Sequence, residues 1–353
     1  MSYLSTLIPD CPNIQASLLS VFGNCFGAGR FRDELPFLTF LASSANSGRL
    51  SQQISPGNGK VRTIELIYDQ RLSLDGIQRN VDNPKCEAEG KKGQCVVTCT
   101  IDTSENLNIG CKIDAQDLER NCQANGEYIQ EQILDLVDAL DRQISKDIAA
   151  KAVSFVGAWA TDVTNQDCTA VTGTNLQVSA GDKINPSGLT YQAIETAAML
   201  TEYCPDKALF GGIDLWNYYQ TIQSGCCASN GIDLSEQFSR FGLASLYDRD
   251  IVEAYGANNF ALLTQPGALQ LITYTRAGWT NGIPGEFHGQ SYYSTTIVSP
   301  KTGIPMDLTV KEDCGSIHIN LTATVDLKAM PADLYAPGDR LEGVNFVNTV
   351  EFV

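Results

Sequence analysis

The chain has 353 residues, with 24 Lys and Arg against 41 Asp and Glu, so its formal net charge is −17. This excess of acid excludes a general nucleic-acid-binding protein and argues against an anionic membrane surface as a partner, because both need clustered Lys and Arg. With 43% hydrophobic and 18% charged residues, the composition is that of a folded protein, and its length allows two or three cores.

The first 54 residues are expected to form an arm that is extended and irregular. Residues 1–60 carry four basic and three acidic side chains, so this segment is nearly neutral while the rest of the chain is acidic. Apolar clusters such as LPFLTFLAS (35–43) indicate that the arm packs on another surface. The opening residues lack the basic and apolar regions of a signal peptide, and no segment is apolar enough to span a membrane. We therefore expect an intracellular protein.

A long β-excursion of two or three strands is predicted for residues 55–114. Alternating side chains predict a strand at 61–72, and two further strands at 95–102 and 107–114 are expected to form a hairpin around the turn between them. The tip of the excursion carries Lys85, Lys91 and Lys92. An excursion of this length cannot bury itself as a lone hairpin, so it must lie along another surface.

Twelve cysteines are present, and free or metal-bound thiols are the usual state in an intracellular chain. Cys99 and Cys111 would face each other across the expected hairpin, so a cross-strand disulfide is one prediction; the alternative is two half-buried free thiols. The chain has no C-x-x-C pair and only two histidines, which argues against zinc.

Residues 126–159 give the clearest helical pattern. Acidic side chains between 127 and 147 are expected to form a solvated face, with Asp138 and Arg142 as an i,i+4 pair. A helix of this length would span about 50 Å, which suggests a spine on which sheets lie. The apolar stripe consists of Ile129, Ile133, Val137, Leu140, Ile144, Ile148 and Ala152.

The second half of the chain mixes shorter helices with strands. We expect a helix at 189–204 with Thr190 as its N-cap, a strand followed by a helix within 207–222, and another helix at 233–242. Strands are expected at 251–256, 260–275 and 292–300, and the segment 303–330 predicts a hairpin that turns at Asp313–Gly315. The predicted fold class is therefore α+β.

No catalytic constellation is evident. The chain lacks the common nucleophile, zinc-protease, phosphate-loop and dinucleotide motifs. His318 falls in an alternating strand and His288 in a loop, while Trp159, Trp216 and Trp279 are interpreted as core or interface anchors. The residues therefore predict no catalytic residue, metal or cofactor.

The order of the predicted elements resembles the major capsid protein of tailed double-stranded DNA phages, which has the HK-ninety-seven-type fold. The resemblance runs in order along the whole chain, and its most family-like segments are 193–219 and RLEGVNFVNTV at 340–350. It implies five parts: an N-terminal arm at 1–54, an extended β-loop at 55–122, the spine helix of the peripheral domain at 123–165, an axial domain at 166–290, and closing strands of the peripheral domain at 291–353.

The resemblance implies a homo-oligomer whose hexamers and pentamers build an icosahedral shell that encloses DNA without binding it specifically. It also implies separate scaffolding, portal and decoration proteins, no cofactor, no membrane partner, and a virion capsid that is assembled in the bacterial host cytoplasm. Lys85, Lys91 and Lys92 would then contact neighbouring subunits. Some members crosslink a loop lysine to an asparagine, for which Asn345 and Asn348 are the candidates. We do not expect this chemistry, because lysines at a solvated loop tip are ordinary.

Two alternatives remain open. An encapsulin-type compartment has the same fold but encloses a cargo enzyme, and the long excursion favours the virus over it. The third hypothesis is an intracellular metal-binding protein that uses the cysteines between Cys86 and Cys122, which stoichiometric zinc and unfolding by a chelator would reveal.

Overall fold

The computed structural model divides into two compact units, each built from three separate segments. The first unit comprises Met1–Ser43, Asp102–Ile148 and Leu271–Asp326, and the second comprises Ser44–Ile101, Ala149–Gln270 and Leu327–Val353. The five parts expected from the sequence are not tested by this division and stay a prediction. The structure describes residues 35–44, 53–55, 61–69, 94–102, 106–114, 125–160, 162–163, 170–178, 181–182, 185–186, 188–212, 214–215, 244–275, 283–287, 290–313, 316–335 and 339–353.

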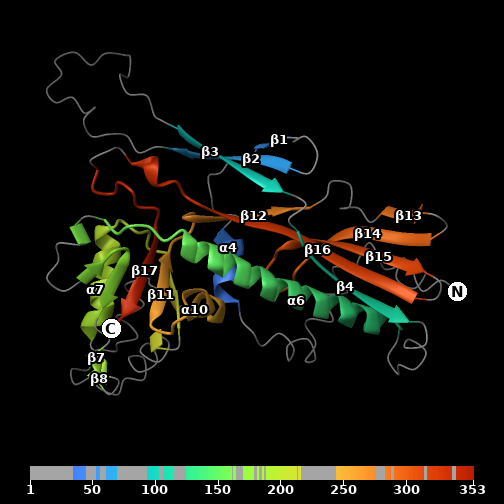
Figure 1. Ribbon diagram of the computed structural model, residues 1–353, viewed down its shortest axis with the longest axis horizontal. Helices are drawn as coiled ribbons and strands as arrows, with labels where there is room; N and C mark the ends of the chain where they lie inside the picture. The colour runs from blue at the N-terminus through green and yellow to red at the C-terminus, as the bar shows by residue number, and fades with distance from the viewer. Residues whose placement is uncertain are drawn as a thin grey trace, which may run out of the picture. The chain divides into compact units, whose positions relative to one another are not determined.

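Helices and strands both occur in the described part, so the α+β class is confirmed. The helix α6 (Asn125–Ser154) is a single 30-residue element, and Figure 1 shows it as one unbroken green ribbon. All seven positions of the predicted apolar stripe are at most 3% exposed. The helix ends five residues earlier than predicted because Phe155 and Val156 donate to carbonyls three residues back, which tightens the last turn, and Gly157 N–H then bonds Val347 O.

The first unit contains a six-stranded sheet, in the order β12-β16-β15-β14-β13, with β4 also paired to β16. The predicted hairpin is confirmed, because β15 and β16 pair from Asp307↔Thr322 to Asp313↔Ser316 beside β14 (Figure 1). The strands are β4 (Leu107–Asp114), β12 (Leu269–Tyr274), β13 (Ile283–Phe287), β14 (Gln290–Val298), β15 (Pro305–Asp313) and β16 (Ser316–Ala329).

The predicted pairing of the strands at 95–102 and 107–114 is wrong, although both strands exist. Among the described residues, β3 (Gln94–Asp102) lies in a separate sheet with β2 (Val61–Asp69) and β1 (Gln53–Ser55), while β4 pairs with β16. Eight register pairs join β4 to β16, which sets its apolar side chains beside those of a long strand with seven of its fourteen residues buried. This cross-strand burial outweighs the local turn signal.

A second six-stranded sheet forms the core of the second unit, in the order β10-β9-β11-β17-β6-β5. β10 with β9 and β17 with β6 are parallel, whereas β9 with β11, β11 with β17 and β5 with β6 are antiparallel. The sheet consists of β5 (Ala170–Thr172), β6 (Asn175–Val178), β9 (Ala208–Gly211), β10 (Ala244–Tyr247), β11 (Phe260–Thr264) and β17 (Val347–Phe352); a two-stranded ladder, β7 (Gly181–Asp182) with β8 (Asn185–Pro186), lies apart.

Two helical predictions need correction. The arm is not wholly extended, because α4 (Pro36–Ser44) is a helix whose apolar side chains Phe37 and Leu38 are buried; Pro36 suits a first helical turn, where its missing N–H costs nothing. In addition, α7 (Gly188–Leu200) begins before Thr190, so Thr190 is inside the helix rather than at its N-cap. The helix predicted at 233–242 lies outside the described residues.

The predicted strand at 251–256 is a helix, α10 (Arg249–Tyr255). The carboxylate Oδ1 of Asp248 accepts hydrogen bonds from the backbone N–H of Asp250 at 3.0 Å and of Ile251 at 3.1 Å, which is an N-cap. Gly256 ends the helix in the left-handed region at φ 71°. These two end signals outweigh the β-branched residues between them.

Replacing Asp248 by Ala should lower the free energy of unfolding by about 1 kcal/mol, because two backbone N–H groups lose their acceptor. Urea unfolding of the purified chain would measure this. Asp248→Asn keeps the Oδ1 acceptor and serves as the matched control, so an equal loss in both variants would rule out the capping account.

Candidate functional site

The structure places only part of the predicted site residues. Lys85, Lys91 and Lys92 lie outside the described residues, so their contacts with neighbouring subunits stay a prediction. Cys99 lies in β3, but its side chain is outside the described part, and Cys111 is a half-buried free thiol in β4, in register with Ile319. The hairpin on which their disulfide was predicted does not form, and the bond itself stays a prediction.

The setting of Cys111 does not favour a reactive thiolate. Burial raises the pKa of its thiol, and the nearby Asp135 carboxylate raises it further. A thiol held in its protonated form is a poor nucleophile and a poor metal ligand. Among the described residues, no three or more His, Cys, Asp or Glu side chains gather closely enough to hold a metal ion, and no helix there is long and apolar enough to cross a membrane.

A buried carboxylate on α6 is the centre of the strongest polar cluster in the first unit. Ser299 Oγ donates to Asp141 Oδ2 at 2.6 Å, and Thr302 Oγ1 donates to Asp141 Oδ1 at 2.9 Å. Both hydroxyls belong to the turn between β14 and β15, and Asp141 is 0% exposed. The prediction that the acids of this helix are all solvated is therefore wrong for Asp141.

The hydroxyl groups of Ser299 and Thr302 donate to Asp141, and the other hydrogen bonds of Ser299 stay within the β14–β15 turn. Ser299 Oγ accepts the backbone N–H of Lys301 and of Thr302, both at 3.2 Å, which occupies its two lone pairs. Gly303 adopts φ 76° and its N–H donates to Ser299 O, which closes the turn. The cluster thus links the β14–β15 turn to the middle of α6.

Burial disfavours the charged form of the Asp141 carboxyl group. Burial raises its pKa to about 6, although the hydrogen bonds from Ser299 and Thr302 and the charge of Lys301 act in the opposite direction. Asp138 lies one turn earlier and forms the predicted ion pair with Arg142, at 2.5 Å, while Lys301 Nζ is 3.9 Å from its other oxygen. Because the side chains of Asp141, Ser299 and Thr302 are enclosed, this arrangement fits a structural link rather than a catalytic group.

A second polar network holds the strand β17 in the second unit. The side-chain amide of Asn348 donates to Gly157 O and Ala158 O, both at 3.0 Å, and its Oδ1 accepts Tyr203 Oη at 2.5 Å. Trp159 Nε1 donates to Thr349 O at 3.3 Å, which confirms that this tryptophan is a core anchor. Asn348 is 0% exposed, so a crosslink to a lysine of another subunit could not reach it in this conformation.

Two tyrosines supply neutral hydroxyls to this network. Burial raises the pKa of Tyr203 well above its ordinary value, and burial likewise raises the pKa of Tyr255. Tyr255 Oη lies 2.7 Å from Thr349 Oγ1, and the rings of Tyr203 and Phe346 meet edge to face at 5.4 Å. The phenols therefore bind the strand without introducing a charge.

A buried ion pair joins α7 to the start of β9. Lys207 Nζ is 3.1 Å from Glu195 Oε2, and the two side chains are 6% and 5% exposed. Burial raises the pKa of Glu195, and Lys207 opposes that shift. Breaking such a pair by removing one partner would leave an uncompensated buried charge.

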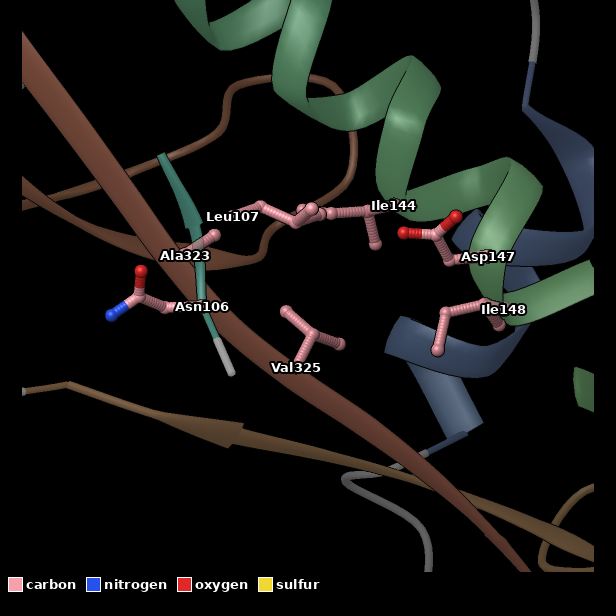
Figure 2. Close-up of a pocket in the computed structure, with 7 residues that line it drawn as sticks. All are labelled: Asn106, Leu107, Ile144, Asp147, Ile148, Ala323 and Val325. Carbon is pink, nitrogen blue, oxygen red and sulfur yellow. The ribbon is translucent and has the colours of Figure 1, made fainter. Parts of the chain in front are cut away.

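A cavity of about 310 Å³ opens within the first unit between α6 and β16, as Figure 2 shows. Asp147 is the titratable side chain in its lining, so the cavity offers no paired acid and base. The lining consists of Asn106, Leu107, Ile144, Asp147, Ile148, Ala323 and Val325.

Comparison with known proteins finds similarity in structure but not in sequence. No protein-family model and no curated protein matches the chain. The chain is similar to a solved structure titled the capsid of Myoviridae phage XM1, at 12% identity over 87% of this chain and 91% of that chain, with a TM-score of 0.40. It is also similar to the capsid of Staphylococcus phage Andhra, at 12% identity over 85% and 82% of the two chains and a TM-score of 0.40.

A third similar structure is the capsid of Ralstonia phage GP4, at 11% identity over 82% of this chain and 83% of that chain, with a TM-score of 0.38.

Proposed function

We propose that this chain is a tailed-phage major capsid protein with the HK-ninety-seven-type fold, which self-assembles into an icosahedral shell around phage DNA. The observation that carries the proposal is the order of the described elements: an arm with α4, the paired strands β2 and β3, the long helix α6, a six-stranded mixed sheet, and the late hairpin β15–β16. This is the order that the resemblance of the sequence implies.

The three-stranded sheet β1-β2-β3 supports an extended loop that packs on a neighbour. Within the described residues it shares no strand with either six-stranded sheet, and β2 and β3 are each nine residues long. A small sheet of this kind gains stability when its faces are buried against another surface. In a shell, the neighbouring subunit supplies that surface.

The charge distribution suits a container for nucleic acid. The net charge of −17 disfavours contact with phosphate, so enclosed DNA would be held without specific binding. The proposal includes hexamers and pentamers, separate scaffolding, portal and decoration proteins, and assembly in the bacterial host cytoplasm before release as a virion. The long loop favours this function over an encapsulin-type compartment, and the protonated thiol of Cys111 gives no support to a metal-binding role.

Electron microscopy of the expressed chain tests the proposal. Closed shells or ordered hexamers and pentamers are expected, either from the chain alone or with a scaffolding protein supplied. A folded chain that remains a monomer under both conditions would contradict the proposal.

The lysines of the loop tip give a sharper test. Changing Lys85, Lys91 and Lys92 together to Ala should reduce the fraction of protein that sediments as shells at least several-fold, while leaving circular dichroism and the unfolding midpoint unchanged. Lys112→Ala is the matched control, because Lys112 is an exposed lysine of β4 that pairs locally with Asp114 at 2.8 Å. Equal assembly by the triple variant would show that these lysines make no important intersubunit contact.

A further inference from the structure

The strand β17 is a central strand that comes from a distant part of the sequence. The other five strands of its sheet lie between Ala170 and Thr264, within the continuous segment 149–270 of the second unit. β17 then enters from residues 347–352, after more than eighty residues that include the β14–β16 strands of the other sheet. The segment 149–270 therefore forms a slot, and a remote piece of chain fills it.

The slot is bounded by two strands, and β17 forms backbone hydrogen bonds with both of them. On one side β17 pairs antiparallel with β11 over five residues, and on the other it pairs parallel with β6 over four. In the described sheet, β5 and β6 connect to the remaining strands through β17. Without a strand in the slot, two rows of backbone groups would lack partners.

Side chains of the slot also select the sequence that fills it. The side chain of Asn348 is bonded to two backbone carbonyls and to Tyr203, and the side chain of Thr349 is bonded to Tyr255. Farther along the strand, Gln177 Nε2 donates to Glu351 Oε2 at 3.1 Å. A strand of different sequence would lose several of these side-chain hydrogen bonds.

The residue at the entrance of the strand is held in an unfavourable conformation. Phe346 adopts φ 57°, in the left-handed region that bulky side chains avoid. Its ring packs against Tyr203 and against Tyr335, whose centroid is 6.2 Å away. Strain of this kind is released if the strand leaves the slot, so Phe346 has the character of a hinge.

We propose that the slot between β11 and β6 is a strand-recognition site that accepts residues 345–353 from a second copy of this chain as well as from its own. The contacts within the slot are the same in both cases, and only the connection through residues 327–346 differs. Exchange of an identical element is a low-cost way to join two copies. The inference does not depend on the proposed function.

Binding of a labelled synthetic peptide of residues 344–353 tests the proposal. The receptor is the full chain with Asn348→Ala and Thr349→Ala, which weakens its own strand. Fluorescence anisotropy should show saturable binding, and the same peptide carrying Asn348→Ala should bind at least tenfold more weakly. If the double variant does not fold, the wild-type chain is refolded from urea with excess peptide, and retained peptide is measured after gel filtration.

A mixing experiment identifies the second copy as a source of the strand. A chain with Asn348→Ala and Thr349→Ala is refolded together with a chain carrying Trp159→Ala and Tyr203→Ala in the slot. A mixed dimer is expected, because the intact slot of the first chain can bind the intact strand of the second chain. Absence of peptide retention in both formats, equal retention of the two peptides, or absence of the mixed dimer would each overturn the proposal.

Discussion

Replacing Asn348 by Ala is expected to lower the free energy of unfolding by about 3 kcal/mol, because truncation of this fully buried amide removes three hydrogen bonds. The carbonyls of Gly157 and Ala158 lose their donor, and Tyr203 Oη loses its 2.5 Å acceptor. Asn348 is 0% exposed, so its side-chain amide makes these bonds out of contact with water. Urea unfolding followed by circular dichroism measures the change.

The matched control for Asn348 is Asn320→Ala, the same substitution on an exposed position of strand β16. It should change the free energy of unfolding by less than about 0.5 kcal/mol, as is usual for surface positions. If the two variants lose similar stability, the network around β17 contributes less than its hydrogen bonds indicate.

The second large effect is a pH dependence that Asp141 introduces. Its pKa is about 6 in the folded chain, mainly because of burial, whereas a carboxyl group in an unfolded chain titrates near pH 3.9. Since the folded pKa is raised, the charged form is penalised only in the fold. The penalty is absent below the unfolded pKa, grows between the two values, and is complete above about pH 6.

The expected result is therefore a loss of stability with rising pH. The free energy of unfolding of the wild type, relative to Asp141→Asn, should fall by about 2 kcal/mol between about pH 4.5 and about pH 7.5. Taking the difference in free energy of unfolding between the wild type and Asp141→Asn removes the contribution of the other carboxylates to the pH dependence. Asp147→Asn, the same substitution at an exposed position of the same helix, is the matched control. A difference that rises with pH would mean that the hydrogen bonds from Ser299 and Thr302 outweigh burial.

Several elements follow from local pattern in the sequence. The stripe from Ile129 to Ala152 predicts α6 because an apolar residue at every third or fourth position can be buried only by a helix. The alternation on either side of Asp313 predicts β15 and β16 because side chains of a strand point to opposite faces. In both cases the signal lies within a few residues of the structure that it determines.

The sequence contains local signals for the helix α10, but the β-branched residues Ile251 and Val252 led to the prediction of a strand. Asp248 before the helix and Gly256 after it are its end markers, and they could have been read from the sequence. The cluster at Asp141 is different, because its partners Ser299 and Thr302 are about 160 residues away. An acid on a helix gives no sign by itself that a distant turn will enclose it.

By itself, the sequence determined the long helix, the late hairpin, the α+β class and an acidic chain without a recognisable catalytic motif. The tertiary structure alone decided that β4 pairs with β16, that Asp141 is buried beneath a turn, and that β17 fills the centre of a sheet. The physical reason is that periodicity and capping act between neighbouring residues. Strand pairing and the burial of polar groups instead depend on which remote segments offer the complementary surface.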